Sequence, residues 1–167
     1  MRGQLRIEMK NPLGLVVEIR EAHNAVMRAG ARLVADLFAG QGRPITHMGV
    51  GTSDTPETDA FATPALTNPQ DGDAEHLNGG TEAAIPPEAF TAELDETSRV
   101  VRVRVRATLS PSAAVGTVRE AGLLSRDGDA AILYNRVTFA PITKGNDHEL
   151  TMFWVISFPY GDLQGLM

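Results

Sequence analysis

The feature that most constrains the fold is the alternation of apolar and polar side chains over residues 99–109, the clearest in the sequence. Three of the positions between the apolar residues carry arginine: Arg102, Arg104 and Arg106. Successive side chains of a β-strand point to opposite faces of its sheet. The pattern therefore predicts a strand with one buried face and one face of guanidinium groups. The apolar positions are Val101, Val103, Val105, Ala107 and Leu109.

Residues 116–158 contain three further strand-like runs, separated by two turn signals. Asp127-Gly128 is a strong hairpin signal, and residues 131–139, rich in β-branched and aromatic side chains, are typical of the returning strand. Pro141 ends that run, and a turn at residues 144–147 leads to a third run with apolar residues at every second position. We interpret the three runs as one contiguous antiparallel meander. We expect Trp154, at the centre of the last apolar face, to be largely buried.

The period changes between residues 21 and 38. Apolar residues recur there every three or four positions, from Ala22 to Leu37, which predicts an amphipathic helix. Gly40 follows the last periodic residue and Pro44 prevents continuation, so the helix should end there. Its apolar face is rich in alanine and glycine. We therefore expect this helix to lie close against a sheet.

Two other segments are extended in different ways. In residues 1–20 apolar and polar side chains alternate weakly, with a break at Asn11-Pro12, which predicts one or two strands or an extended arm. Residues 45–51 have the composition of a short buried strand. Residues 54–87 are rich in Pro, Gly and acidic residues, with Phe61, Leu66 and Leu77 as their few large apolar side chains.

Ordering one residue costs roughly 1–2 kcal/mol of conformational entropy. Residues 54–87 have little apolar surface whose burial could offset that cost. We therefore expect residues 54–87 to form an extended loop or arm that orders against a neighbouring subunit. Phe61, Leu66 and Leu77 would be its anchors.

These patterns predict one domain over residues 1–167. At least five strand-like runs against one helical period favour a mainly β fold, an antiparallel β-sandwich with one packed α-helix and a long irregular arm or loop. A chain of 167 residues can bury a sizeable core. It contains no cysteine, so its stability must come from packing or oligomerisation, not from disulfides.

Charge and hydropathy narrow the possible partners. The formal net charge is −6, which argues against nucleic-acid binding, because phosphate recognition favours a basic surface. No run approaches the roughly 20 apolar residues of a membrane span, so we expect no membrane insertion. The amino-terminal residues lack the apolar core of a secretory signal. We expect the chain to be made and to mature in the cytoplasm.

No residue pattern predicts catalysis, and we expect neither a catalytic residue nor a cofactor. The four histidines are not spaced as paired metal ligands, the glycine clusters lack the Lys-Ser/Thr ending of a phosphate-binding loop, and no serine lies in a nucleophile elbow. A small enzyme is the remaining alternative. It would need a pocket containing titratable groups with displaced pKa values.

The arginines at positions 102, 104 and 106 have three interpretations. They can form the solvated outer face of a sheet, they can pair with carboxylates of their own or a neighbouring subunit, or they can contact nucleic acid. We favour the second because many acidic residues lie between Asp54 and Glu96. Contact with nucleic acid is the least favoured of the three interpretations, because the total charge of the chain is negative.

Three segments, taken in order, carry a resemblance to a known family. The first segment, residues 45–51 (ITHMGVG), follows the alanine-rich helix and forms a strand ending in a glycine-bounded turn. The second, residues 118–124 (VREAGLL), precedes another glycine-containing turn. The third, residues 136–144 (RVTFAPITK), leads into the last apolar strand. This order resembles the amino-terminal domain of tail-collar and tail-fibre proteins of contractile-tailed bacteriophages. Residues 66–87 are not part of the family pattern.

The resemblance implies a non-enzymatic virion structural protein, located in the tail or collar region. It would attach or position tail, collar, fibre or baseplate components, with itself and other virion proteins as partners. The pair Arg119-Glu120 would be structural, one side chain facing outward and the other satisfying a backbone turn. A capsid decoration or receptor- and glycan-binding module is the alternative. The low aromatic content, 5% of residues, leaves few side chains for a carbohydrate platform.

Overall fold

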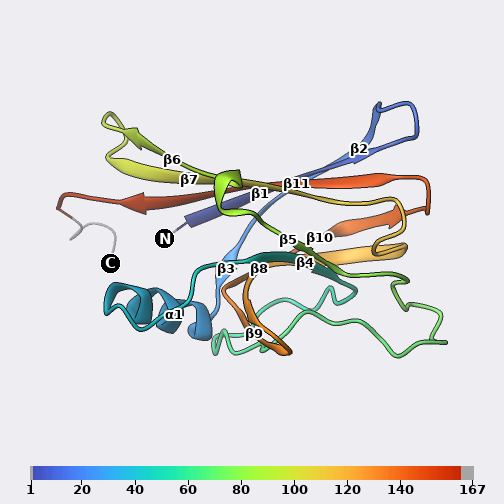
Figure 1. Ribbon diagram of the computed structural model, residues 1–167, viewed down its shortest axis with the longest axis horizontal. Helices are drawn as coiled ribbons and strands as arrows, with labels where there is room; N and C mark the ends of the chain where they lie inside the picture. Colours follow the sequence, from blue (N-terminus) through green and yellow to red (C-terminus); the bar gives the residue numbers. More distant parts are fainter. Residues whose placement is uncertain (1, 163–167) are drawn as a thin grey trace.

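The computed structural model describes residues 2–162 as two antiparallel sheets packed face to face (Figure 1). This confirms the predicted mainly β sandwich with a single α-helix. The elements are β1 (Arg2–Lys10), β2 (Val16–His23), β3 (Ala25–Val26), α1 (Arg28–Phe38), β4 (His47–Gly51), β5 (Glu82–Ala84), a 3-10 turn (Pro87–Ala89), β6 (Phe90–Asp95), β7 (Val100–Leu109), β8 (Gly116–Asp127), β9 (Ala130–Leu133), β10 (Asn135–Lys144) and β11 (Glu149–Pro159).

The first sheet has the strand order β2-β1-β11-β7-β6. Its inner face is formed by the alternate apolar residues that the sequence predicted. Trp154 of β11 lies between Leu5 of β1 and Val105 of β7, and its side chain is completely buried. The arginines of β7 lie on the opposite, outer face. The predictions for residues 99–109 and for Trp154 are therefore confirmed.

The second sheet has the order β3-β10-β8-β4-β5, with β9 paired to β8. β8 is long enough to pair with β10 along its first half and with β9 along its second half. The predicted hairpin at Asp127-Gly128 joins β8 to β9. The predicted strand at residues 45–51 is also confirmed, as β4.

The contiguous meander predicted for residues 116–158 is wrong. β11 leaves the second sheet and pairs between β1 and β7 in the first. Pro141 also does not end its strand, because β10 continues to Lys144 through a register shift between Thr138 and Ile142. A proline is tolerated at such an irregularity, where its missing N–H is not needed for pairing.

The helix begins at Arg28, not at residue 21. Residues 16–23 form a strand that pairs with β1. The spacing between Ala22 and Val26 fits a helix, but it also fits every second position of a strand. Pairing with β1 therefore overrides the helical pattern in residues 16–23. The predicted close packing is confirmed at Gly30, where a Cβ atom would lie only 2.0 Å from the carbonyl oxygen of Tyr134. The helix ends beside Gly40, as predicted. No helix within residues 2–162 is long and apolar enough to cross a membrane.

The amino-terminal residues are two strands and not an arm, and β1 is a central strand of its sheet. Of the two alternatives predicted for residues 54–87, the irregular loop is confirmed for residues 54–81, whereas an arm that leaves the domain is not. Leu77 is completely buried in the same core as Trp154, and Ile85 is almost completely buried there. β5 pairs with β4, so the last residues of this segment belong to the second sheet. The segment is ordered by its own chain and cannot be removed without opening the core.

Candidate functional site

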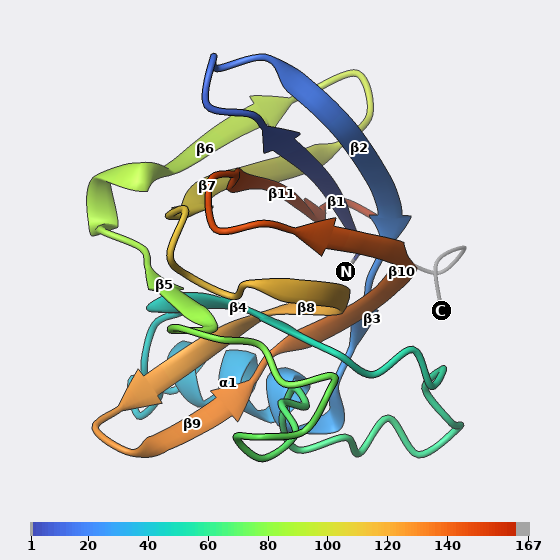
Figure 2. The same ribbon diagram turned by 90° about the vertical axis from the view of Figure 1, so that its right-hand side faces the viewer.

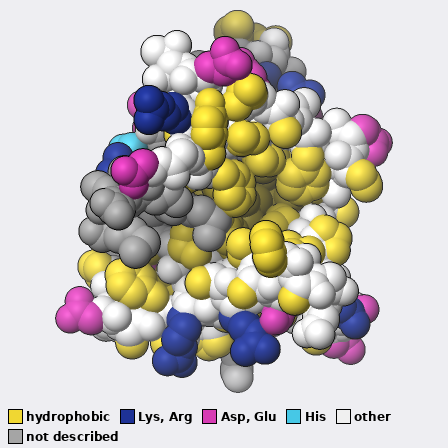
Figure 3. All heavy atoms as spheres, turned by 90° about the vertical axis from the view of Figure 1, so that its left-hand side faces the viewer, with side chains coloured by type: hydrophobic (Ala, Val, Ile, Leu, Met, Phe, Trp, Pro, Cys, Tyr) yellow, Lys and Arg dark blue, Asp and Glu magenta, His cyan; other side chains and the backbone are white. Residues whose placement is uncertain are grey.

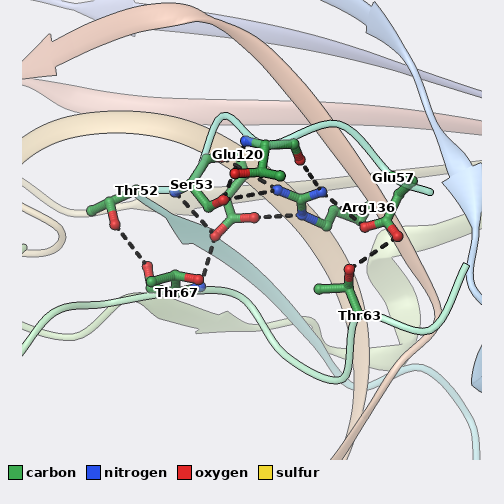
Figure 4. A network of polar contacts seen from close by, with 8 residues as sticks. Thr52, Ser53, Glu57, Thr63, Thr67, Glu120 and Arg136 are labelled. Carbon is green, nitrogen blue, oxygen red and sulfur yellow. Dashed lines mark hydrogen bonds and ion pairs between the residues drawn. The ribbon is translucent and has the colours of Figure 1, made fainter.

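The most elaborate polar site in the described structure surrounds Glu120, in the middle of β8. Both faces of this strand are covered around Glu120, whose side chain is completely buried. One carboxylate oxygen, Oε1, accepts hydrogen bonds from the backbone N–H of Thr67 at 2.7 Å and of Ser53 at 3.4 Å. The other, Oε2, accepts from Nε of Arg136 at 2.5 Å (Figure 4). A single carboxylate thus joins two separate parts of one long loop to the sheet.

Arg136 in β10 extends this network, and only 3% of its side chain is exposed. Its Nη1 atom donates to Oε1 of Glu57 and to the carbonyl oxygen of Thr55, both at 2.8 Å. The Oε2 atom of Glu57 accepts a hydrogen bond from Thr63 at 2.9 Å. One guanidinium and two carboxylates carry a net charge of −1, and the surrounding N–H and O–H donors stabilise the second carboxylate.

Gly51 at the end of β4 makes room for this network. A Cβ atom at position 51 would lie 2.3 Å from Oε1 of Glu120 and 2.7 Å from the carbonyl oxygen of Thr67. Any larger residue would push the loop away from the carboxylate. The backbone of Thr52 then donates to the carbonyl oxygen of Thr67 at 2.9 Å, which holds the two loop segments together.

We call Glu57, Glu120, Arg136 and the loop groups that they bind the buried clamp. Its charged atoms are turned toward one another and toward loop backbone, as Figure 4 shows, so the arrangement fixes the loop on the sheet. This fits the structural role that the resemblance implied for Arg119-Glu120 and assigns the two residues. Glu120 satisfies the loop backbone, whereas Arg119 reaches outward toward Glu75, with 3.5 Å between the charged atoms.

The rest of the loop is fixed by a second set of contacts. The side-chain amide of Asn68 donates to the carbonyl oxygen of Leu77 at 3.2 Å, and its Oδ1 atom accepts from the backbone N–H of Leu77 at 2.8 Å. No lysine or arginine occurs between residues 44 and 98. The loop therefore presents a solvent-exposed surface of carboxylates, which we call the acidic loop: Asp54, Asp59, Asp71, Asp73 and Glu75.

The arginines predicted as an interface lie on the outer face of the first sheet, which we call the arginine face. Arg102 pairs with Asp95 at 2.5 Å and Arg104 with Glu93 at 3.3 Å, both within the same chain. The backbone N–H of Ser98 and the guanidinium of Arg102 lower the pKa of Asp95 to about 2. Arg106 forms no ion pair with any residue in 2–162. The predicted carboxylate pairing is therefore confirmed within the chain for two of the three arginines.

Two adjoining surface clefts cross the arginine face, with volumes of about 570 and 610 Å³. Arg104 and Phe153 line the first cleft, and Arg102 lines the second. Burial raises the pKa of Tyr134 and lowers that of Lys144, but these two buried groups lie outside both clefts.

The histidines are distributed over different parts of the fold. His47 contacts the hydroxyl of Thr46, and His76 contacts the carbonyl oxygen of Pro69. In the part of the chain that the structure describes, no three His, Cys, Asp or Glu side chains form a group able to hold a metal ion.

The three apolar residues predicted as anchors for a neighbouring subunit have different environments. Leu77 is inside the core of its own chain, so its prediction as an interface residue is wrong. Leu66 is half-buried and packs against the cluster that contains Leu124. Phe61 remains exposed. Polarity alone could not predict that the loop would fold back, because its strongest anchor is a carboxylate and not an apolar side chain.

Comparisons with known proteins give no match to this chain, whether with protein-family models, with curated proteins or with solved structures.

Proposed function

We propose that this chain is a non-enzymatic virion structural protein of a tailed bacteriophage or a phage-derived particle. It attaches or positions tail, collar, fibre or baseplate components through contacts between subunits. The resemblance of residues 45–51, 118–124 and 136–144 to tail-collar and tail-fibre domains supports this proposal. The structural observation that carries it is an acidic loop fixed on one side of the molecule and, on the opposite side, a face with exposed arginines, of which Arg106 forms no ion pair within residues 2–162.

The arginine face covers the outer side of the first sheet. The acidic loop lies along the second sheet, on the side away from the first (Figures 1 and 2). The buried clamp holds that loop in one conformation, so little ordering is left to be done on binding. An acidic loop on one side and exposed arginines on the other favour contact with further copies of the chain or with other virion proteins, and charge complementarity sets the specificity and rate of such contacts.

Self-association of the purified protein should therefore depend on salt. We expect sedimentation velocity to show oligomers near 0.1 M salt that dissociate toward 1 M, because the screening length falls from about 10 Å to about 3 Å. The double variant Arg104→Glu/Arg106→Glu should reduce association at low salt.

The matched control is Arg28→Glu/Arg32→Glu, which makes the same change of charge on the exposed side of α1. Oligomers that respond to neither salt nor the change on the arginine face would contradict a role for this face.

One observation favours the alternative of a receptor- or glycan-binding module. Phe153 lines a cleft beside polar side chains, including Gln4 and Arg6, which is the combination of ring and hydrogen-bonding groups that sugars require. Glycan-array binding that is lost in Phe153→Ala would support that alternative against the assembly proposal.

A further inference from the structure

The exposed apolar side chains of this molecule are concentrated at two places. Of the eleven large hydrophobic residues that are exposed within residues 2–162, nine belong to elements and turns that Figure 1 places toward opposite ends of the long axis. Five belong to the turn between β1 and β2 and to β2: Leu13, Leu15, Val16, Val17 and Ile19. Four lie at the other end, on α1 and near the β6–β7 turn: Leu37, Phe38, Leu94 and Tyr160.

The first place is a projecting, rigid turn, residues 11–17, which we call the apolar tip. The Oδ1 atom of Asn11 accepts hydrogen bonds from the backbone N–H groups of Leu13 and Leu15, at 2.9 and 3.0 Å. The backbone of Asn11 and that of Gly14 are also bonded within the turn. None of the seven residues carries a charge, and 82% of Leu13 is exposed. The tip can therefore enter an apolar site with these backbone donors already satisfied.

The second place is a hollow, which we call the open end. Leu94, Val101 and Phe158 are opposite one another on β6, β7 and β11, in the row that continues the inner face of the first sheet. Leu94 is 57% exposed, so this row extends past the covered part of the core. Figure 1 places α1 below the same end of the first sheet, and Leu37 and Phe38 of α1 are exposed. Figure 3 shows the hydrophobic side chains surrounding a hollow on this face.

We propose that the apolar tip of one copy inserts into the open end of a second copy, so that the chains join head to tail. This inference rests on the proposed role in a particle built from repeated subunits. Such an arrangement covers both the convex apolar tip and the concave apolar site, which lie toward opposite ends of one chain. Pairing tip to tip would leave the open end exposed. Head-to-tail contacts of this kind generate rings when the rotation closes and filaments when it does not.

Disulfide mapping tests the contact directly, because the chain has no cysteine of its own. Two single variants, Leu13→Cys in the tip and Leu94→Cys in the open end, are mixed and oxidised at increasing concentration. Both native side chains are mostly exposed, so each variant should fold. Ile132→Cys, on the exposed side of β9, is the matched control.

We expect the mixed dimer, joined by a disulfide between positions 13 and 94, to exceed every pair that includes position 132. A disulfide formed mainly between two copies of the Leu13→Cys variant would indicate tip-to-tip pairing and overturn the proposal. The absence of any preferred intermolecular disulfide would also overturn it. Salt-dependent oligomers without the mixed disulfide would reject this contact but retain the proposed function.

Association should also respond to charge at the tip. Leu13→Glu should raise the dissociation constant for self-association about tenfold or more, because burial of one leucine contributes at least that factor. Ile132→Glu introduces the same charge at an exposed site outside both ends and should leave the constant unchanged. An equal effect of the two substitutions would contradict a specific role for the tip.

Discussion

Trp154→Ala is expected to lower the free energy of unfolding by about 3–5 kcal/mol. The side chain is completely buried at the centre of the first sheet, between Leu5 and Val105. Truncation leaves a cavity that strands paired on both sides of β11 cannot close. Denaturant unfolding of the variant and the parent protein, followed by circular dichroism, measures the difference.

Trp154→Phe is the matched control for that experiment. The indole N–H has no hydrogen-bond partner among the described residues, so phenylalanine keeps much of the packing and removes a buried donor. We expect a smaller loss than for alanine. If Trp154→Ala unfolds at the same denaturant concentration as the parent protein, the position assigned to this side chain is wrong.

Arg136→Met is the second substitution with a large expected effect, about 3–5 kcal/mol of unfolding free energy. It removes the guanidinium from between two carboxylates and leaves the completely buried carboxyl of Glu120 without its cationic partner. It also releases the carbonyl oxygen of Thr55, so the first part of the loop should detach. Limited proteolysis should then cleave residues 54–63 much faster than in the parent protein.

Arg104→Met is the control, because it removes an arginine from an exposed ion pair and should cost less than about 1 kcal/mol. The double variant Glu120→Gln/Arg136→Met should lose less than the sum of its single variants, because the unpaired buried charge is gone. A loss for Arg136→Met as small as that for Arg104→Met would show that the buried clamp does not hold the loop.

The sequence predicted those strands that have one buried and one exposed face. The alternation at residues 99–109 and around Trp154 gave the correct inner face because period two is a direct consequence of strand geometry. It did not indicate which sheet a strand joins. β11 follows β10 closely in the chain but pairs with β1 and β7, and only long-range packing decides that choice.

Errors arose where two periods fit the same residues. Ala22 and Val26 are spaced as on a helix and as on a strand, and pairing of Ala22 with β1 and of Val26 with β10 determined the outcome. The buried clamp was missed because its partners are distant in the sequence. Glu120 and Arg136 are 16 residues apart, and Thr67 is 53 residues from Glu120. The available signal was a glutamate within the apolar run of residues 118–124, since a charge buried there requires a partner.

The virion structural role can be tested by quantitative mass spectrometry of phage or phage-like particles, purified by density gradient from cells that encode this chain. We expect the protein to be present in intact particles, in a fixed ratio to the other tail components, and to remain bound after repeated purification. Its absence from particles, with the protein recovered only in the soluble fraction of the same cells, would contradict a virion structural role.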